Sequence, residues 1–526
     1  MTRERDIRLE EEKVLLLNKG RRGLLRVIFG RTLLLAVLIL LQVWLLVSAF
    51  VRMGEIYFGS AAVVSLVAAL VVVNRKKENP AIKITWILLI MLVPAIGVPL
   101  CFYVRGDLGY RLVRRRLRRL KEETAELLPT GKEAAARLGK EHPGAAGVVS
   151  YMERICGQPV YGGSGTHYLP TGEAAFEEML RQLEQAEKFI FLEFFIIAEG
   201  YMWGRILRVL EQKARQGVEV RVLYDGSNVM NNLPYRYPER LEKLGIRCKM
   251  FAPPRPLASV YYNNRDHRKI LIVDGRAAFT GGVNLADEYI NRTSPYGHWK
   301  DTAVMITGEA VRSFTMMFLQ MWSVSSSGRE DYSRYLDASR PVEADGFVLP
   351  YGDSPFEAER VGETVYLDMI NRSNRYVHIM TPYLIIDNEM MTALTFAAKR
   401  GVDVKLIVPG IPDKKTVFAL TRSSCRELMD SGVEIWEYTP GFVHGKMCVS
   451  DDAAAVVGSI NFDYRSLYLH FECAALLLGC DAVRDVEKDI RETLGRCRRL
   501  TAEDCRRDSA LRRLISWLLR PLAPLM

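Results

Sequence analysis

The chain has 526 residues, and 72 lysines and arginines against 62 aspartates and glutamates give it a formal net charge of +10. This length allows two or three domains with large cores, and 49% hydrophobic with 25% charged residues excludes wholesale disorder. The nine cysteines include no Cys-x-x-Cys pair. That argues against a disulfide-stapled protein and a zinc ribbon, and favours a reducing compartment.

Nearly all the long apolar runs lie in the first 105 residues. Residues 32–51 and 56–73 carry no charge, and each run is long enough to cross a hydrocarbon core about 30 Å thick as a helix. A third run, 84–104, contains two prolines and a glycine, so it either spans with a kink or dips in and returns. Charge-rich residues precede the first run, which argues against a cleaved signal peptide. We predict a helical membrane anchor over residues 1–105.

Basic residues flank all three runs and continue through 105–121. Three full spans cannot place every basic group in the cytoplasm, whereas a re-entrant third run can. We therefore predict a multi-pass protein of the cell membrane with a cytoplasmic catalytic part. Residues 106–145 are expected to form a basic linker that is either solvated or lies on anionic headgroups. Because the positive excess sits beside the apolar runs, no nucleic-acid partner is expected.

From residue 146 the chain alternates short β-rich runs with helical patterns, and the pattern occurs twice. Each copy is strand, helix, strand, followed by another helix and a glycine-led strand. The expected strands are 188–197, 217–223 and 245–251 in the first copy, and 375–384, 401–407 and 432–438 in the second. Two copies of one α/β unit predict a pseudo-twofold molecule.

The duplication suggests domain limits. We expect one domain over 146–330 and the other over 331–505, with the stretch from about 325 to 360 as the connection between the halves. The remaining 506–526 alternate basic and apolar residues. As a helix this tail either lies on a membrane surface or docks on the catalytic core.

Each copy also carries a polar cluster in which lysine, aspartate and asparagine follow a histidine at matching positions. The two sets are His267, Lys269, Asp274 and Asn284, and His444, Lys446, Asp451 and Asn461. Identical spacing within a repeat is not expected by chance. We take the histidine, lysine and aspartate of each set as the six candidate catalytic residues: His267, Lys269, Asp274, His444, Lys446 and Asp451.

The spacing predicts a geometry. Residues two apart in a strand share a face, so His267 and Lys269 point together. A tight turn at Asp274 and Gly275 returns Asn284 beside His267, and a hairpin centred near 452 does the same for the second copy. The two aspartates sit at the turns, where we expect them to orient the turn or pair with a base.

These residue types suit phosphate chemistry. Two lysines and two asparagines can cradle non-bridging oxygens, while one histidine attacks phosphorus and the other protonates the leaving alcohol. No acidic cluster with metal-ligand spacing accompanies them, so we expect no metal and no other cofactor. The sequence predicts phosphodiester transfer through a phosphohistidine.

A working imidazole usually needs a partner on its other nitrogen, and Asp301 and Glu472 are the candidate orienters. Glu193 is either a buried partner of a site cation or an edge-strand charge. The histidines that lack the motif are expected to be ordinary surface or core residues: His142, His167, His298, His378 and His470.

The paired motifs resemble those of the phospholipase D superfamily, and the resemblance to bacterial cardiolipin synthases extends over about 75–526. Further matching segments are Asn79-Pro80, 192–195, Trp299-Lys300-Asp301, Thr381-Pro382-Tyr383, 461–466 and 513–517. This chain departs from the family in its apparent extra span at 32–51. It also has Ser459 where the first copy has Gly282, a small-for-small change expected to leave phosphate access intact.

The resemblance implies two α-β-α sandwich halves and transfer of a phosphatidyl group from one phosphatidylglycerol to another, giving cardiolipin and glycerol. It makes His267 the nucleophile and His444 the general acid. It also makes Lys269, Lys446, Asn284 and Asn461 phosphate ligands, and phosphatidylglycerol and anionic membrane lipids the partners. Homo-oligomerisation stays open.

Two alternatives remain at this stage. The first is a membrane-bound phospholipase D, or another phosphatidyltransferase in which water or a different alcohol is the acceptor. The second is a catalytically silent lipid-binding scaffold, against which the complete duplicated set of side chains argues.

Overall fold

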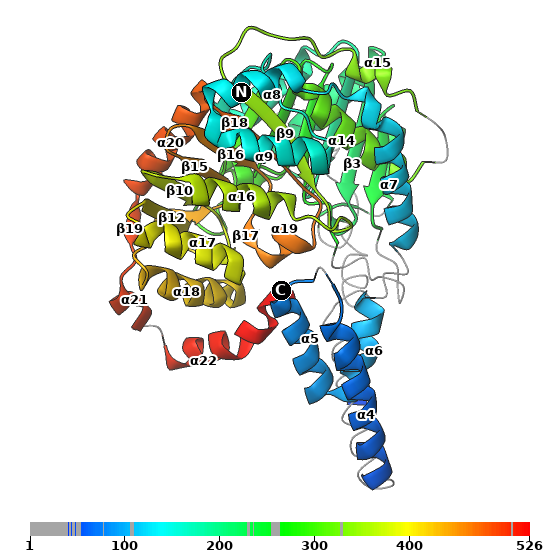
Figure 1. Ribbon diagram of the computed structural model, residues 1–526. Coiled ribbons are helices and arrows are strands. Elements are labelled where there is room, and N and C mark those ends of the chain that lie inside the picture. The colour runs from blue at the N-terminus through cyan, green and yellow to red at the C-terminus, as the bar shows by residue number, and fades with distance from the viewer. Residues whose placement is uncertain are drawn as a thin grey trace, which may run out of the picture.

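The computed structural model describes residues 54–525, with gaps at 77, 106–109, 229–231, 235, 254–263, 327–329 and 507–508, and isolated positions between 40 and 48. The expected first span, 32–51, therefore lies almost wholly outside the described residues. Within them, two sheet-containing halves form the body, and a group of helices projects from it (Figure 1).

The first half is built on a seven-stranded sheet in which β2, β3 and β4 are parallel and the other neighbours antiparallel. Its spatial order is β1 (Thr166–Leu169), β8 (Ala303–Thr307), β6 (Ala277–Gly281), β5 (Lys269–Val273), β2 (Phe189–Phe194), β3 (Glu219–Asp225) and β4 (Arg247–Phe251). The helices of this half are α10 (Gly172–Glu184), α11 (Tyr201–Arg215), α13 (Tyr237–Glu242) and α14 (Val311–Val324).

The second half repeats this order and adds one edge strand. Its strands run β9 (Phe347–Asp353), β18 (Glu472–Leu478), β16 (Ala454–Gly458), β15 (Met447–Ser450), β10 (Tyr376–Met380), β12 (Asp403–Pro409), β13 (Glu434–Tyr438) and β19 (Cys497–Arg499). Its helices are α16 (Val361–Arg372), α17 (Asn388–Lys399), α18 (Lys415–Met429) and α20 (Asp481–Leu494). The predicted duplication is confirmed. The expectation that all of 325–360 connects the halves is wrong, because β9 is a strand of the second sheet.

A shared core joins the two halves. Phe191, Ile272 and Val304 of the first sheet belong to the same buried apolar cluster as Val457 and Leu477 of the second. Strands buried on both faces read as continuous apolar runs, which is why Phe189–Phe194 and Lys269–Val273 lack a polar face.

Shorter elements complete the body. They are α7 (Arg111–Thr124), α8 (Lys132–Glu141), α9 (Ala146–Tyr151), α15 (Ser333–Leu336), α19 (Tyr464–Tyr468), α21 (Ala502–Arg506), β7 (His298–Lys300), β11 (Leu384–Ile385), β14 (Gly441–Val443) and β17 (Phe462–Asp463). Strand β14 pairs in parallel with β7, so this small sheet links the two halves.

The third apolar run folds back on itself. It forms α5 (Pro80–Leu92) and α6 (Pro94–Arg105), which pack against each other and against α4 (Gly54–Val73). Asn79 caps α5 by accepting from the amide of Ala81 at 2.9 Å. A Cβ at Gly97 would lie 2.4 Å from the Leu89 carbonyl oxygen, so the two helices can approach this closely only with glycine there.

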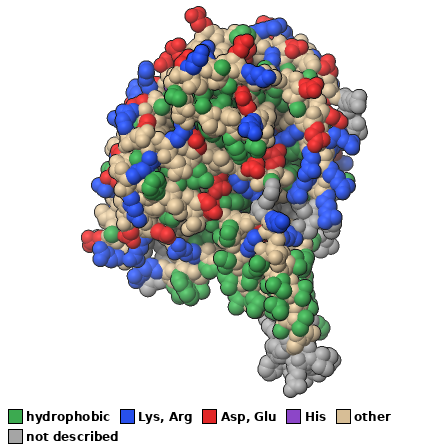
Figure 2. Space-filling model, viewed as in Figure 1, with side chains coloured by type: hydrophobic (Ala, Val, Ile, Leu, Met, Phe, Trp, Pro, Cys, Tyr) green, Lys and Arg blue, Asp and Glu red, His purple; other side chains and the backbone are tan. Residues whose placement is uncertain are grey.

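Hydrophobic side chains cover much of this projection (Figure 2). Those with large exposed fractions include Val63, Leu66, Leu70, Ile84, Met91, Leu92 and Phe102. Among the described helices, none is both long and apolar enough to cross a membrane.

The C-terminal tail forms α22 (Ala510–Leu519) and a short 3-10 segment, η7 (Arg520–Leu525). It docks on the rest of the protein. The Ser516 hydroxyl donates to the Ala419 carbonyl at 3.1 Å, and the Thr85 hydroxyl of α5 donates to the Pro521 carbonyl at 2.6 Å. Trp517 and Leu518 remain exposed. Docking is confirmed, and contact of the outer face with a membrane stays a prediction.

Candidate active site

The two motif hairpins have the predicted register. Leu271 pairs with Phe279 in the first and Met447 with Val457 in the second, which centres the turns on residues 275 and 452. Asp274 and Gly275 have φ of 53° and 66°. Asp451 and Asp452 have φ of 56° and 57°. These left-handed pairs favour Asp, Asn and Gly.

The motif aspartates hold the turns to the neighbouring strands. The Asp274 carboxylate accepts from the backbone amides of Glu187, Lys188 and Phe189 at 2.7–2.8 Å, ahead of β2. Asp451 accepts in the same way from residues 374, 375 and 376 at 2.7–2.9 Å. Asp274 and Asp451 therefore do not belong with the catalytic side chains, and the candidate set is corrected. Both carboxylates accept backbone hydrogen bonds at the turns, so the expectation that Asp274 and Asp451 orient the turns is confirmed.

The second-half histidine meets a carboxylate of the first half. Because β14 and β7 pair Val443 with Lys300, the next residues along each strand, His444 and Asp301, lie side by side. His444 Nδ1 is 2.7 Å from Asp301 Oδ2, and the His444 amide donates to the Lys300 carbonyl at 2.7 Å.

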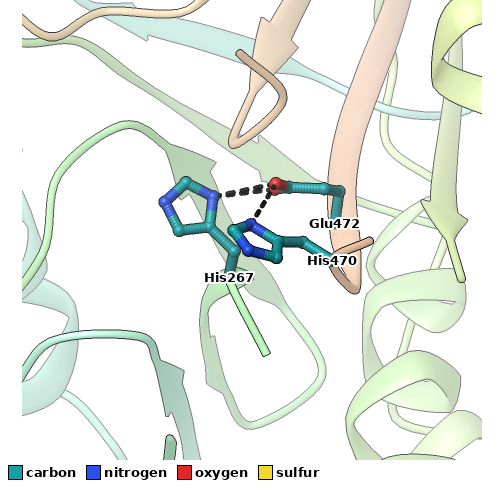
Figure 3. Close-up of side chains that lie close together, drawn as sticks. All are labelled: His267, His470 and Glu472. Carbon is teal, nitrogen blue, oxygen red and sulfur yellow. Dashed lines mark hydrogen bonds and ion pairs between the residues drawn. The ribbon is translucent and has the colours of Figure 1, made fainter. Parts of the chain in front are cut away.

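The first-half histidine meets a carboxylate of the second half. Asp266 bridges Phe471, and the His267 amide donates to the Phe471 carbonyl at 2.9 Å. His267 Nδ1 then lies 2.9 and 3.0 Å from the two carboxylate oxygens of Glu472 (Figure 3). Both candidate orienters thus hold a histidine, and in each case the contact crosses between halves.

Burial lowers the pKa of both motif histidines. Burial, Lys269 and Lys446 lower the pKa of His267 well below its usual value. Burial and Lys446 lower that of His444 to about 4. Although burial opposes it, the neighbouring His444 holds the pKa of Asp301 below its usual value. Both imidazoles are thus neutral at neutral pH and available as nucleophile or base.

The two lysines are buried beside their histidines. Lys269 donates to the His267 carbonyl, and Lys446 donates to the His444 carbonyl. Lys446 Nζ also lies 2.9 Å from His444 Nδ1. Burial lowers the pKa of Lys269 to about 8 and that of Lys446 to about 7. Two ammonium groups with little solvent favour an anionic ligand.

The two asparagines differ in their surroundings. Asn284 Oδ1 accepts from the Ile196 amide at 3.0 Å, and its Nδ2 donates to the Tyr289 hydroxyl at 2.8 Å. The Tyr289 ring centroid lies 5.3 Å from that of His444. Asn461 is buried, and its Oδ1 has no hydrogen-bond partner among the described residues.

Glu193 is fully buried on the central strand β2 and forms an ion pair with Arg268, the residue between His267 and Lys269. Burial raises its pKa well above the usual value. The edge-strand interpretation is therefore wrong, because Glu193 pairs with a cation inside the motif.

Sequence reasoning missed His470. Its ring centroid lies 5.4 Å from that of His267, and its Nδ1 is 3.7 Å from Glu472 Oε1 (Figure 3). Burial lowers its pKa to about 3. It stands two residues before Glu472, so strand alternation could have placed both on one face. His298 and His378 pair with Tyr438 and Glu487 instead, as ordinary residues do.

Two groups in the described part of the chain have side-chain donor atoms close enough to hold a metal ion. The donor atoms of His267, His470 and Glu472 lie within 4.8 Å of one another, as do those of Glu363, Asp387 and Glu389. In the first group, the Glu472 carboxylate already lies within hydrogen-bond distance of His267 Nδ1.

The small residues after each hairpin fit the carboxylates. A Cβ at Gly282 would lie 2.0 Å from Asp301 Oδ1 and 2.8 Å from the His444 carbonyl oxygen. In the second copy the Ser459 hydroxyl instead donates to Glu472 and accepts from the Cys473 amide at 3.1 Å. The interpretation of this pair as a small-for-small change is thus incomplete, because glycine leaves room for one carboxylate and serine holds the other.

Comparisons with known proteins agree with this site. A family model described as cardiolipin synthase, PLD-like domain, matches residues 179–322 and 366–494, which include both motifs. The chain belongs to the cardiolipin synthase family of phospholipase D-like proteins.

Individual relatives cover most of the chain. A cardiolipin synthase of Geobacillus kaustophilus is 34% identical over 88% of this chain and 92% of its own length. A Streptococcus mutans protein named only as uncharacterized is 48% identical over 87% of this chain and 99% of its own length. Among solved structures, phosphatidylserine synthase of Haemophilus influenzae has a similar fold, with a TM-score of 0.55 at 14% identity over 72% of this chain and 98% of that one.

Gly282→Ala is expected to lower kcat by about 10²-fold, because the added methyl displaces Asp301 from His444. Ser459→Ala removes one hydrogen bond to Glu472 without a clash and should cost no more than about tenfold. Turnover of both purified variants, with thermal unfolding as the folding control, checks this. Equal losses in the two variants would contradict it.

The pH dependence follows from the lysines. Their pKa values of about 8 and about 7 in the free protein mean that positive charge is lost as pH rises through this range. We expect kcat/KM to fall over those pH values and kcat to fall only at higher pH, because bound phosphate stabilises the ammonium groups. A kcat/KM profile that stays flat up to the ordinary lysine pKa would contradict this.

Proposed function

We propose that this protein is a cardiolipin synthase that transfers a phosphatidyl group from one phosphatidylglycerol to a second, releasing glycerol. The observation that carries the proposal is the buried site itself. Two histidines, each held at Nδ1 by a carboxylate of the opposite half, lie with two buried lysines. The family membership supplies the lipid substrate.

In the proposed first step, His267 attacks the phosphorus of phosphatidylglycerol through Nε2, since Nδ1 faces Glu472. The anionic phosphodiester, once bound, favours uptake of a proton by His444. The bond from phosphorus to the glycerol oxygen breaks, and the protonated His444 gives that oxygen its proton. In the second step the free hydroxyl of another phosphatidylglycerol loses its proton to His444 and attacks phosphorus. The phosphorus–nitrogen bond breaks, and His267 is restored.

The electrostatics support this assignment of roles. Asp301 lies 2.7 Å from Nδ1 of His444 and partly offsets the effect of burial, so it favours the protonated form of this histidine. Burial and the two lysines lower the pKa of His267 well below its usual value, so it stays neutral, as a nucleophile must. We propose Lys269, Lys446, Asn284 and Asn461 as phosphate ligands, the lysines by charge and the asparagines by amide contacts.

The surrounding acids have positioning roles in this proposal. Asp301 and Glu472 fix the tautomer and orientation of the two imidazoles. Glu193 forms an ion pair with Arg268 and so positions the segment that carries His267 and Lys269. Asp274 and Asp451 maintain the turns.

We propose that the protein works at the cell membrane, anchored through 32–51 and the exposed apolar side chains of α4, with the α5–α6 hairpin entering and returning on the catalytic side. The fold-back at Val93 and Pro94 supports re-entry, since it leaves both ends of the hairpin facing the body (Figure 1). Basic residues at both ends support a cytoplasmic catalytic part.

Purified protein incubated with phosphatidylglycerol alone should form cardiolipin and glycerol in equal amounts, and EDTA should leave the rate unchanged. His267→Ala and His444→Ala should each lower the rate by about 10³-fold or more while membrane association is retained. Phosphatidic acid as the main product would instead support a phospholipase. No turnover by the wild type, with unaltered lipid binding in His267→Ala, would support a scaffold.

A further inference from the structure

A cavity of about 720 Å³ lies outside the catalytic cluster, between the α5–α6 hairpin, α7 and the second half. Its apolar lining comes from Ile82, Trp86, Val104, Leu117, Phe356 and Leu525. Its basic lining comes from Arg75, Lys76, Arg114, Arg118, Lys121 and Arg360. Three acidic residues also line it, and one of them, Glu357, pairs with Lys121. The cavity therefore combines an excess of positive charge with an apolar wall.

Helix α7 presents one face to this cavity. Arg114, Leu117, Arg118 and Lys121 all line it, at the spacing of one helical face. Arg115 and Arg119 of the same helix are exposed and do not line it. One face of this basic segment is thus exposed and the other lies toward the hairpin, and its contact with headgroups stays a prediction.

Arg360 adds a cation from the opposite wall. Its Nη1 is buried and has no hydrogen-bond partner within the described part of the chain, and its guanidinium lies 5.1 Å from the Tyr468 ring centroid. A buried guanidinium nitrogen without a partner is costly unless a ligand supplies an acceptor.

The cavity adjoins the segments that carry the catalytic pair. Tyr468 and Leu469 line it and directly precede His470, and Asn264 lines it three residues before His267. Both segments lead directly into the bridge between Asp266 and Phe471, which brings His267 to Glu472. The hairpin that supplies Ile82 and Trp86 to the cavity also exposes Ile84, Leu88 and Phe102 elsewhere on its surface.

We propose that this cavity binds one molecule of an anionic diacyl phospholipid, and this rests on the proposed function. Its phosphate contacts the basic face of α7 and Arg360, and its acyl chains lie along the hairpin. Phosphatidylglycerol held there stands beside the route to His267. The apolar lining of the cavity favours a lipid over a free phosphate, which would leave that lining in water.

Two double variants with the same loss of charge test the site. Arg114→Gln with Arg118→Gln removes cations from the cavity face, and Arg115→Gln with Arg119→Gln removes them from the exposed face. Full-length proteins are assayed in phosphatidylcholine vesicles with a varied mole fraction of phosphatidylglycerol. The cavity pair should raise the mole fraction needed for half-maximal rate by roughly tenfold, with kcat within about twofold of the wild type. The exposed pair should match the wild type in both values.

A binding measurement separates this site from the proposed reaction. His267→Ala protein is exposed to a photoactivatable phosphatidylglycerol, and the label should map to α5 or α7 and be lost in the Arg114/Arg118 background. Photoactivatable phosphatidylcholine should not label these helices, and glycerol phosphate should not compete. Labelling elsewhere, or equal effects of the two arginine pairs at unchanged thermal stability, would overturn the site. If the wild type forms no cardiolipin, the proposed reaction is refuted but the lipid-binding site is not.

Discussion

The contact on which the rest of the molecule depends is the exchange of carboxylates between the two halves. His267 is held by Glu472, and His444 is held by Asp301. Neither motif histidine takes its carboxylate from its own half. Each histidine follows a segment that pairs with the other half, as β14 pairs with β7 before His444. The two halves must therefore pack closely, and their sheets share one core.

The pairing is nearly symmetric, and the exceptions have physical causes. Gly282 leaves space for Asp301, whereas Ser459 donates to Glu472. Trp299 lies beside His444 as His470 lies beside His267, each two residues before its carboxylate. In addition, the Nζ atom of Lys446 lies 2.9 Å from Nδ1 of His444. A duplicated site whose surroundings differ in this way can give its two histidines different proton affinities, as separate nucleophile and acid roles require.

Much of this could be predicted from the sequence because it depends on local periodicity. The strand alternation and the turn at Asp274 and Gly275 determine the hairpin register, and the repeat predicts the duplicated sheet. The partners of Asp301 and Glu472, the closeness of His470 and the cavity beside α7 could not be predicted, since each depends on how segments far apart in the chain pack. Strand β9 was missed because it stands in a stretch without its own repeat signal.

The most direct test of the exchanged carboxylates is the rate at which a covalent phosphatidyl adduct forms on His267. Asp301→Asn should slow this rate by about 10²-fold in the wild-type background and should add nothing in the His444→Asn background, because it acts through that histidine. Glu472→Gln should slow it further in the same background. An equal effect of Asp301→Asn with and without His444, or an adduct on His444, would contradict the account.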